Sequence, residues 1–158
     1  MAKIYTGGTF DLFHAGHVNF LRQCYNLSRF MSPKDRKQFE GGWLAEPEVF
    51  VSLNTDEFIY QYKGHYPVYS YQERMDILLG CKYVGHVIPN SGGADSKPAI
   101  LEVKPEIIAI GTDWASKDYY KQMGFTQEWL DEQNIQLIYL PYTPGATTTE
   151  LKRRISDE

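Results

Sequence analysis

The chain has 158 residues, of which 42% are hydrophobic and 23% charged, and its formal net charge is -4. This length fits one domain that buries about two-thirds of the surface its unfolded form would expose, so we expect a single domain over residues 1–158. The 16 basic residues are scattered and do not alternate with aromatic residues as in a polynucleotide-binding groove, and no apolar run reaches the roughly 20 residues of a membrane span. We therefore expect neither nucleic-acid binding nor membrane insertion.

The cysteines and the N-terminus indicate the compartment. Cys24 and Cys81 both fall in stretches with a helical pattern, and the first residues lack the basic flank and apolar core of a signal peptide. The two cysteines do not form the pattern of a disulfide framework, and disulfide bonds are rare in the cytosol. We therefore predict a cytoplasmic protein with reduced thiols.

Short apolar runs alternate with helical stretches along the chain. The runs are residues 4–6, 49–53, 83–88, 107–110 and 137–140. Helical periodicity marks residues 17–30 and 71–79, and Ser70 with Glu73 has the spacing of a capping box at the start of the second stretch. Strands that alternate with helices predict an α/β fold, a Rossmann-like, doubly wound, five-stranded parallel sheet.

One segment interrupts this alternation. Residues 31–47, "MSPKDRKQFEGGWLAEP", contain two prolines and a Gly-Gly pair between the first helical stretch and the second apolar run. A connection of about 2–6 residues is typical at this position. The segment is predicted to be an inserted loop.

The segment "GGTFDLFHAGH", residues 7–17, follows the first predicted strand directly. Gly7 and Gly8 allow the backbone to approach a ligand, and the free N–H groups of a helix that begins near Gly16 favour an anion such as phosphate. His14 and His17 are positioned to donate hydrogen bonds to that anion and to stabilise charge in a transition state.

A metal site is the alternative interpretation of the same segment. Asp11, His14 and His17 are spaced by three residues, a pattern that metal ligands can have. The sequence offers no second cluster with ligand spacing, because His65 and His86 stand alone. A metal-dependent hydrolase is therefore an open but weaker hypothesis.

Several ordered motifs resemble one family. "GTFDLFHAGH" is similar to the signature of the HxGH nucleotidyltransferase superfamily, and "NTDEF", "YKG", "SYQER", "IGTDW" and "YTPGATTTELKRRI" resemble, in order, the motifs of its cytidylyltransferases, in particular those that act on glycerol 3-phosphate. The resemblance covers nearly the whole chain except the insertion. It implies the HxGH nucleotidyltransferase fold.

The resemblance also implies a reaction and its substrates. The phosphate of a small acceptor attacks the α-phosphorus of CTP, and pyrophosphate leaves, with Mg²⁺ accompanying the triphosphate. The implied catalytic residues are His14, His17, Lys63 and Arg74. No metal ligands are predicted from the protein, and relatives of this size suggest a homodimer.

The remaining site residues follow from the same motifs. The predicted nucleotide-binding residues are Thr6, Gly7, Gly8, Thr9, Phe10, Gly16, Gly111, Asp113, Tyr142, Gly145, Thr147, Thr148 and Thr149, and the predicted acceptor-binding residues are Asp11 and Trp114. Alternatives stay open for three positions: Asp11 could accept bonds from loop amides, Arg74 could form a structural ion pair, and Thr147 with Glu150 could simply be a capping box.

The sequence departs from the family pattern at several motif positions. Tyr142 stands where the cytidylyltransferases have an arginine and Pro144 where they have a glutamate, while Gly85 and His86 replace an acidic pair and Thr112 replaces an aspartate. The missing arginine leaves the base open. An adenylyltransferase that uses ATP and a sugar phosphate is the first alternative, and an inactive nucleotide-binding protein is a further one.

Overall fold

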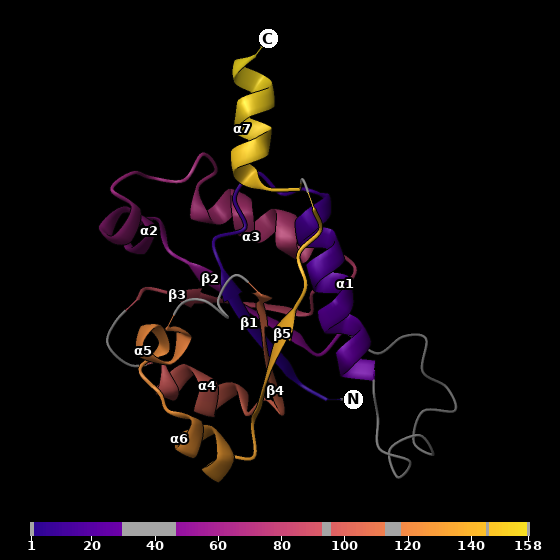
Figure 1. The fold of residues 1–158 in the computed structure, drawn as a ribbon, viewed down its shortest axis with the longest axis vertical. Helices are drawn as coiled ribbons and strands as arrows, with labels where there is room; N and C mark the ends of the chain where they lie inside the picture. Colours follow the sequence, from indigo (N-terminus) through magenta and orange to yellow (C-terminus); the bar gives the residue numbers. More distant parts are fainter. Residues whose placement is uncertain (1, 30–46, 93–95, 113–117, 145, 158) are drawn as a thin grey trace.

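A computed structural model describes residues 2–29, 47–92, 96–112, 118–144 and 146–157 (Figure 1). In this part of the chain one sheet contains the strands β1 (Ile4–Gly8), β2 (Val49–Asn54), β3 (His86–Asn90), β4 (Ile107–Gly111) and β5 (Gln136–Leu140). Their order is β3-β2-β1-β4-β5, and every neighbouring pair is parallel. The predicted five-stranded parallel sheet is confirmed.

The helices of the described residues are α1 (Ala15–Arg29), α2 (Asp56–Lys63), α3 (Tyr71–Leu79), α4 (Lys97–Val103), α5 (Tyr119–Met123), α6 (Gln127–Glu132) and α7 (Thr148–Ser156). The helix predicted at 71–79 has the predicted bounds, and both bonds of its capping box, between Ser70 and Glu73, are present. In this part of the chain, no helix has the length and apolar character that a membrane span requires.

Two sequence predictions need correction near the end of α3. The third strand begins at His86 rather than at residue 83, because residues 81–84 form a turn in which the Val84 amide donates to the Cys81 carbonyl at 3.1 Å. Cys81 thus follows α3 instead of lying within a helix, whereas Cys24 is buried in α1. The inserted loop predicted at 31–47 lies outside the described residues except for Pro47.

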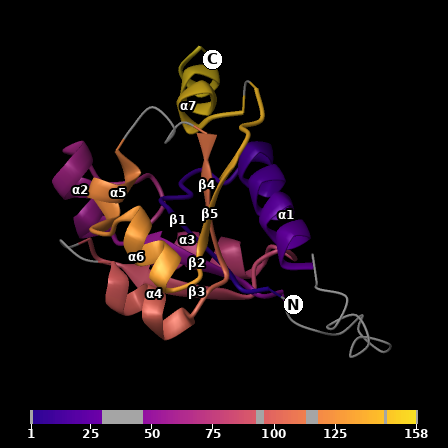
Figure 2. The same cartoon turned by 60° about the horizontal axis from the view of Figure 1, so that its bottom comes forward.

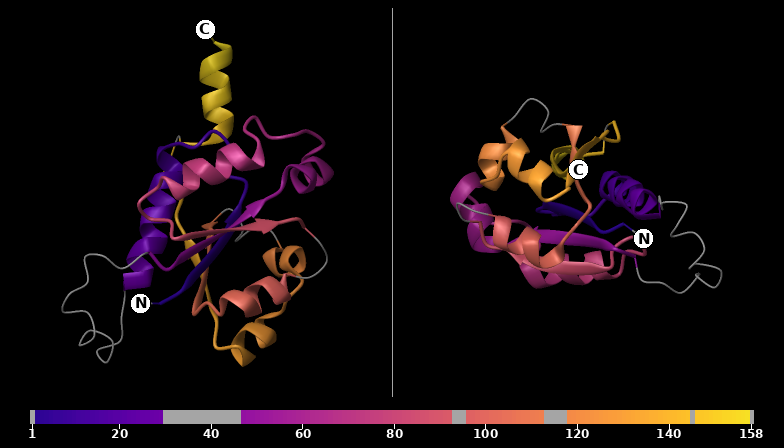
Figure 3. Two further views of the ribbon diagram at one scale, coloured as in Figure 1. Left: turned by 180° about the vertical axis from the view of Figure 1, so that it is seen from behind. Right: turned by 90° about the horizontal axis from the view of Figure 1, so that it is seen from below.

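Two apolar cores cover the two faces of the sheet. Leu21 and Cys24 of α1 and Leu78 of α3 pack with strand residues in one core. Ile100 of α4 and Leu130 of α6 belong to the other core. Figures 1, 2 and 3 show the sheet between α1 and α3 on one side and α4 to α6 on the other. The strands are buried on both faces, which explains their nearly continuous apolar sequences.

The strand order reverses at β1, which pairs with β2 on one side and with β4 on the other. In open α/β sheets, the carboxyl ends of the strands beside such a reversal form the ligand crevice. Helix α7 begins above this edge and extends away from the body of the protein (Figure 1). A ligand crevice is therefore expected at the loops that follow β1, β2 and β4.

Candidate active site

A cavity of about 740 Å³ opens at the carboxyl edge of the sheet. Its lining includes the last residue of four strands, namely Gly8, Asn54, Asn90 and Gly111. The cavity is thus in the place that the strand order predicts for a ligand.

Most of the predicted site residues line this cavity: Gly7, Gly8, Thr9, Phe10, Asp11, His14, Gly16, His17, Lys63, Gly111, Tyr142, Thr147 and Thr148. Thr6, Arg74 and Thr149 are described but are not among the lining residues. Asp113, Trp114 and Gly145 lie outside the described residues. The structure therefore brings predicted residues from the segment 7–17 together with Lys63, Gly111, Tyr142, Thr147 and Thr148 around one cavity.

His14 and His17 stack on each other at the start of α1. Their ring centroids are 3.8 Å apart and their planes differ by 24°. The backbone N–H of His14 donates to Nδ1 of His17 at 3.2 Å, and the backbone N–H of Gly16 donates to Nδ1 of His14 at 3.0 Å. Because each Nδ1 accepts a hydrogen bond, each neutral ring carries its proton on Nε2. Both Nε2–H groups are then available as donors to a ligand.

Burial keeps these two rings neutral. Desolvation lowers the pKa of His14 below its ordinary value of 6.5. The pKa of His17 falls to about 3, chiefly because the ring is desolvated and secondly because His14 is close, although Asp11 opposes the shift. At neutral pH the pair therefore acts through hydrogen bonds rather than through positive charge.

Gly16 is required by the close contact between this helix start and the loop before α7. A Cβ atom at this position would lie 2.7 Å from the carbonyl oxygen of Ala146 and 2.8 Å from Cε1 of His14. Any side chain would displace the loop or the His14 ring. The glycine of the His-Ala-Gly-His segment thus permits close packing around the histidines.

The loop between β1 and α1 is strained and is held by Asp11. Phe10 and Leu12 have φ angles of 50° and 46°, a conformation unusual for residues with a Cβ atom. The Asp11 carboxylate accepts bonds from the amides of Val68 at 2.7 Å and Tyr69 at 2.9 Å. Of the two roles considered for Asp11, the structure shows the structural one.

This arrangement argues against the metal-site hypothesis. The Asp11 carboxylate is directed to backbone amides, and Nδ1 of each histidine already accepts an N–H group. Within the described ranges, no group of three or more His, Cys, Asp or Glu residues could hold a metal ion. The geometry does not support a metal-dependent hydrolase.

Arg74 is a structural residue, which corrects its predicted catalytic role. Its side chain is fully buried, and Nη2 pairs with the Asp56 carboxylate at 2.7 Å. Nη1 donates to the carbonyl oxygens of Thr9 at 2.9 Å and Asn54 at 2.8 Å. With no exposed surface the guanidinium cannot contact a phosphate, but it joins the carboxyl ends of β1 and β2.

A second helix start faces the cavity beside the histidines. Thr147 is the N-cap of α7, and its hydroxyl accepts a bond from the Glu150 amide at 3.0 Å. The Thr148 hydroxyl donates to the Asp11 carbonyl at 3.1 Å, which ties α7 to the strained loop. Lys152, which the sequence analysis did not single out, also lines the cavity. The start of α7 and Lys152 therefore lie beside the histidines in the cavity lining, an arrangement that favours an anion.

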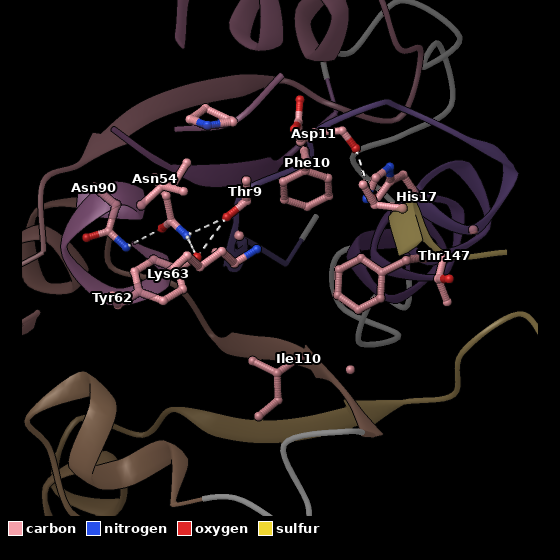
Figure 4. Close-up of a pocket in the computed structure, with 18 of the residues that line it drawn as sticks. Thr9, Phe10, Asp11, His17, Asn54, Tyr62, Lys63, Asn90, Ile110 and Thr147 are labelled. Atoms are coloured by element: carbon pink, nitrogen blue, oxygen red, sulfur yellow. Dashed lines mark hydrogen bonds between the residues drawn. The ribbon is translucent and has the colours of Figure 1, made fainter. Parts of the chain in front are cut away.

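The opposite side of the cavity holds a polar network that sequence reasoning missed. The Nδ2 group of Asn90 donates to Oδ1 of Asn54 at 2.9 Å, and Nδ2 of Asn54 donates to Oγ1 of Thr9 at 3.1 Å. Thr9 and the Tyr62 hydroxyl are 3.0 Å apart. Figure 4 shows this network well separated from His17 and Thr147. Its members come from the ends of three strands and from α2, so no local sequence motif indicates the network.

Three of the departures from the family pattern can be located in the structure. Tyr142 lines the cavity and is half exposed. His86 stacks on Phe50, with ring centroids 4.3 Å apart, and a Cβ atom at Gly85 would overlap the carbonyl oxygen of Pro47. Gly85 and His86 thus serve the fold at the edge strand.

Comparison with known proteins decides the family. No protein-family model matches the chain. The chain is 30% identical over 157 residues to a glycerol-3-phosphate cytidylyltransferase of Bacillus subtilis (strain 168), and the alignment covers 99% of this chain and 98% of that protein. The chain belongs to the cytidylyltransferase family. It is accordingly an enzyme, a nucleotidyltransferase.

A further relative and one solved structure are also similar to this chain. A FAD synthase of Pyrococcus horikoshii is 28% identical to this nucleotidyltransferase over 163 residues, which cover 98% of this chain and 93% of that protein. A solved structure of a lipopolysaccharide core biosynthesis protein from Thermoplasma volcanium matches with a TM-score of 0.61 and 19% identity, over 90% of this chain and 98% of that one. The structural match confirms the fold.

Proposed function

We propose that this nucleotidyltransferase transfers CMP from CTP to a small phosphorylated alcohol such as glycerol 3-phosphate, with release of pyrophosphate. The observation that carries the proposal is the nearly full-length alignment with a glycerol-3-phosphate cytidylyltransferase. The cavity geometry supports it, because two helix starts and two neutral imidazoles meet at one end of the cavity, where a triphosphate would be stabilised.

The chemistry is a single in-line displacement. An oxygen of the acceptor phosphate forms a bond to the α-phosphorus of CTP, and the bond from that phosphorus to the bridging oxygen breaks as pyrophosphate departs with its electron pair. The Nε2–H groups of His14 and His17 donate to the phosphoryl oxygens as charge develops on them. Thr147, the amides at the start of α7 and Lys152 hold the leaving pyrophosphate.

Mg²⁺ enters this scheme as part of the substrate. Within the described residues no cage of carboxylates or imidazoles is present to hold a resident ion. Mg²⁺ commonly binds through water and phosphate oxygens when it accompanies a nucleotide. We therefore propose the Mg²⁺ complex of CTP as the nucleotide substrate.

ATP is the alternative nucleotide. FAD consists of an adenylyl group joined to the phosphate of FMN, so the FAD synthase relative favours transfer of AMP as a second possibility. Tyr142, in place of an arginine, removes one contact expected in a cytidylyltransferase. The acceptor would then be a different phosphate ester, handled by the same phosphate-binding end.

We also propose that the enzyme works in the cytoplasm as a homodimer. Two free cysteines among the described residues support the compartment. Exposed side chains on and after α2, namely Tyr60, Tyr66 and Val68, offer apolar surface for a second copy. Light scattering coupled to size-exclusion chromatography tests the dimer, and a monomer mass would reject it.

A substrate panel tests the proposed reaction. Purified protein is offered CTP or ATP with Mg²⁺ and glycerol 3-phosphate, a sugar phosphate or FMN, and pyrophosphate release is followed. CTP with glycerol 3-phosphate is expected to be fastest. The substitutions His14→Ala and His17→Ala should each lower kcat by about 10² to 10³, the cost of one preorganised donor. His86→Ala, outside the cavity lining, is the matched control and should keep its turnover.

Two outcomes would reject parts of this proposal. Faster turnover with ATP than with CTP would show that the enzyme is an adenylyltransferase instead. Normal turnover in His17→Ala would remove the catalytic role of the histidine pair.

A further inference from the structure

The polar network on the far side of the cavity has a fixed direction. The backbone N–H of Gly92 can only donate, and its bond of 3.2 Å identifies Oδ1 of Asn90 as the acceptor. Nδ2 of Asn90 must then donate to Oδ1 of Asn54. Nδ2 of Asn54 is consequently directed at Thr9 at 3.1 Å and at the Tyr62 hydroxyl at 3.4 Å. One backbone amide thus sets the orientation of both side-chain amides.

This direction leaves one hydroxyl proton for a ligand. Both hydroxyl oxygens accept from Asn54, and one of their two protons is used in the bond of 3.0 Å between Thr9 and Tyr62. The other proton has no acceptor within this network. We call this chain of bonds the amide relay; it runs from Gly92 through Asn90 and Asn54 to the hydroxyls of Thr9 and Tyr62. The amide relay therefore presents one neutral O–H donor to the cavity.

The amide relay lies on the side from which an acceptor would enter. An in-line displacement requires the attacking oxygen to approach opposite the leaving pyrophosphate. The leaving group is assigned to the end with Thr147 and His17, and Figure 4 shows Asn54, Asn90 and Tyr62 on the other side of the view, with Thr9 and Lys63 between. Lys63 can hold the acceptor phosphate while the amide relay faces the rest of the acceptor.

The charges around the amide relay favour an uncharged group. Among the described lining residues the carboxylates are Asp11 and Asp118. Asp11 accepts from the Val68 amide, and Asp118 caps α5 by accepting from the Lys121 amide at 3.0 Å. Each carboxylate is thus engaged by backbone N–H groups. A cationic head group would meet the amide relay without a dedicated countercharge.

We infer that the amide relay determines acceptor choice: it selects a phosphorylated polyol, whose hydroxyl oxygens accept the free O–H proton, over a phosphorylated amine. The inference rests on the proposed function and specifies the acceptor for that site. Buried Asn54 fixes the orientation of the partly exposed Thr9–Tyr62 pair, so an acceptor without that hydroxyl loses one oriented hydrogen bond to the cavity.

Asn54→Asp tests the inference with little change in shape. The new carboxylate keeps the bond from Asn90 but accepts the protons of both Thr9 and Tyr62, which removes the free donor and adds a negative charge. We expect the ratio of kcat/KM for glycerol 3-phosphate to that for ethanolamine phosphate to fall at least about tenfold, the scale of one lost hydrogen bond to a substrate. The KM for CTP should stay unchanged, because the relay does not reach the triphosphate end.

Asn90→Asp is a second, independent route to the same result. The carboxylate would make the Asn54 amide turn round, so that Oδ1 of Asn54 accepts the hydroxyl protons and the free donor is again lost. Asn134→Asp is the matched control, since Asn134 is exposed at the end of α6 and outside the cavity lining. Circular dichroism establishes that each variant is folded, and Asn90→Asp decides the matter if Asn54→Asp unfolds.

The outcomes separate the inference from the function on which it rests. If the wild-type enzyme turns over no phosphorylated alcohol with CTP, the proposed function fails, and the inference fails with it. An active wild type together with folded variants whose acceptor ratios equal that of Asn134→Asp would overturn the inference alone. A shift toward ethanolamine phosphate in Asn54→Asp, absent in Asn134→Asp, would establish it.

Discussion

The two ends of the cavity are assembled in different ways. The histidine pair of the phosphate end is local: the contacts among His14, Gly16 and His17 span two or three residues of sequence within one helix start, and α7 joins this end from far along the chain. The amide relay is non-local, since Asn54 and Asn90 are 36 residues apart and meet because β2 and β3 pair in register. The histidine contacts depend on one short segment, whereas the amide relay depends on the pairing of two strands. In the proposed function, the groups that act on the phosphates and the groups that select the acceptor are therefore separate parts of the cavity.

Arg74 supports the amide relay and the beginning of the strained loop from the protein interior. Its guanidinium bonds to the carbonyl of Thr9 in the strained loop and to that of Asn54 in the amide relay. Arg74→Met leaves these carbonyls and Asp56 without their donor. The free energy of unfolding should fall by about 3 kcal/mol or more, measured by urea denaturation, and activity should fall with it.

Arg74→Lys sharpens this prediction. A lysine keeps the charge but cannot reproduce the fork that binds a carboxylate and two carbonyls, so it should recover only part of the stability. A variant with Met at position 74 that was as stable as the wild type yet inactive would restore a direct role in phosphate binding.

The same contrast explains what the sequence could predict. The strand-helix alternation predicted the fold, and the segment "GGTFDLFHAGH" predicted several residues that line the cavity, because both depend on neighbours in the chain. Arg74 was misassigned because a sequence motif does not show whether an arginine is buried beside a carboxylate such as Asp56. Asn54, Asn90 and Tyr62 were missed because their partnership exists only after the strands have paired.

Gly16→Ala should displace groups at the phosphate end and leave the amide relay unchanged. The added methyl group would lie 2.7 Å from the Ala146 carbonyl and 2.8 Å from the His14 ring, so the loop or the ring must move. A displacement of about 1 Å at reacting groups can cost roughly 10²-fold in rate. We expect kcat/KM for CTP to fall by about that factor in steady-state assays.

The KM for the acceptor provides the contrast in this variant. It should stay close to the wild-type value, because the amide relay does not contact Gly16. An equal loss toward both substrates would show that the two ends are coupled.

Acid should destabilise the protein through His17 at the phosphate end. The pKa of His17 is about 3 in the folded protein, below its ordinary value of 6.5. The unfolded chain therefore takes up a proton below pH 6.5 that the folded protein does not, and stability falls as pH decreases from that value. Between pH 7.5 and 5.5 the unfolding free energy should drop by about 1 kcal/mol through this residue. Urea denaturation of the wild type and of His17→Gln measures it, and equal slopes in the two proteins would contradict the assignment.

Thr147→Ala should have the smallest effect and still separate two functions of one residue. Its hydroxyl caps α7 by accepting from the Glu150 amide, and loss of such a cap costs about 1 kcal/mol. If the helix start also holds pyrophosphate, the KM for CTP should rise several-fold as well, whereas Thr149→Ala, exposed on the same helix turn and outside the cavity lining, should change neither quantity. A lower melting temperature with an unchanged KM would confine Thr147 to its structural role and leave the binding of the leaving group to the histidines, the backbone amides and Lys152.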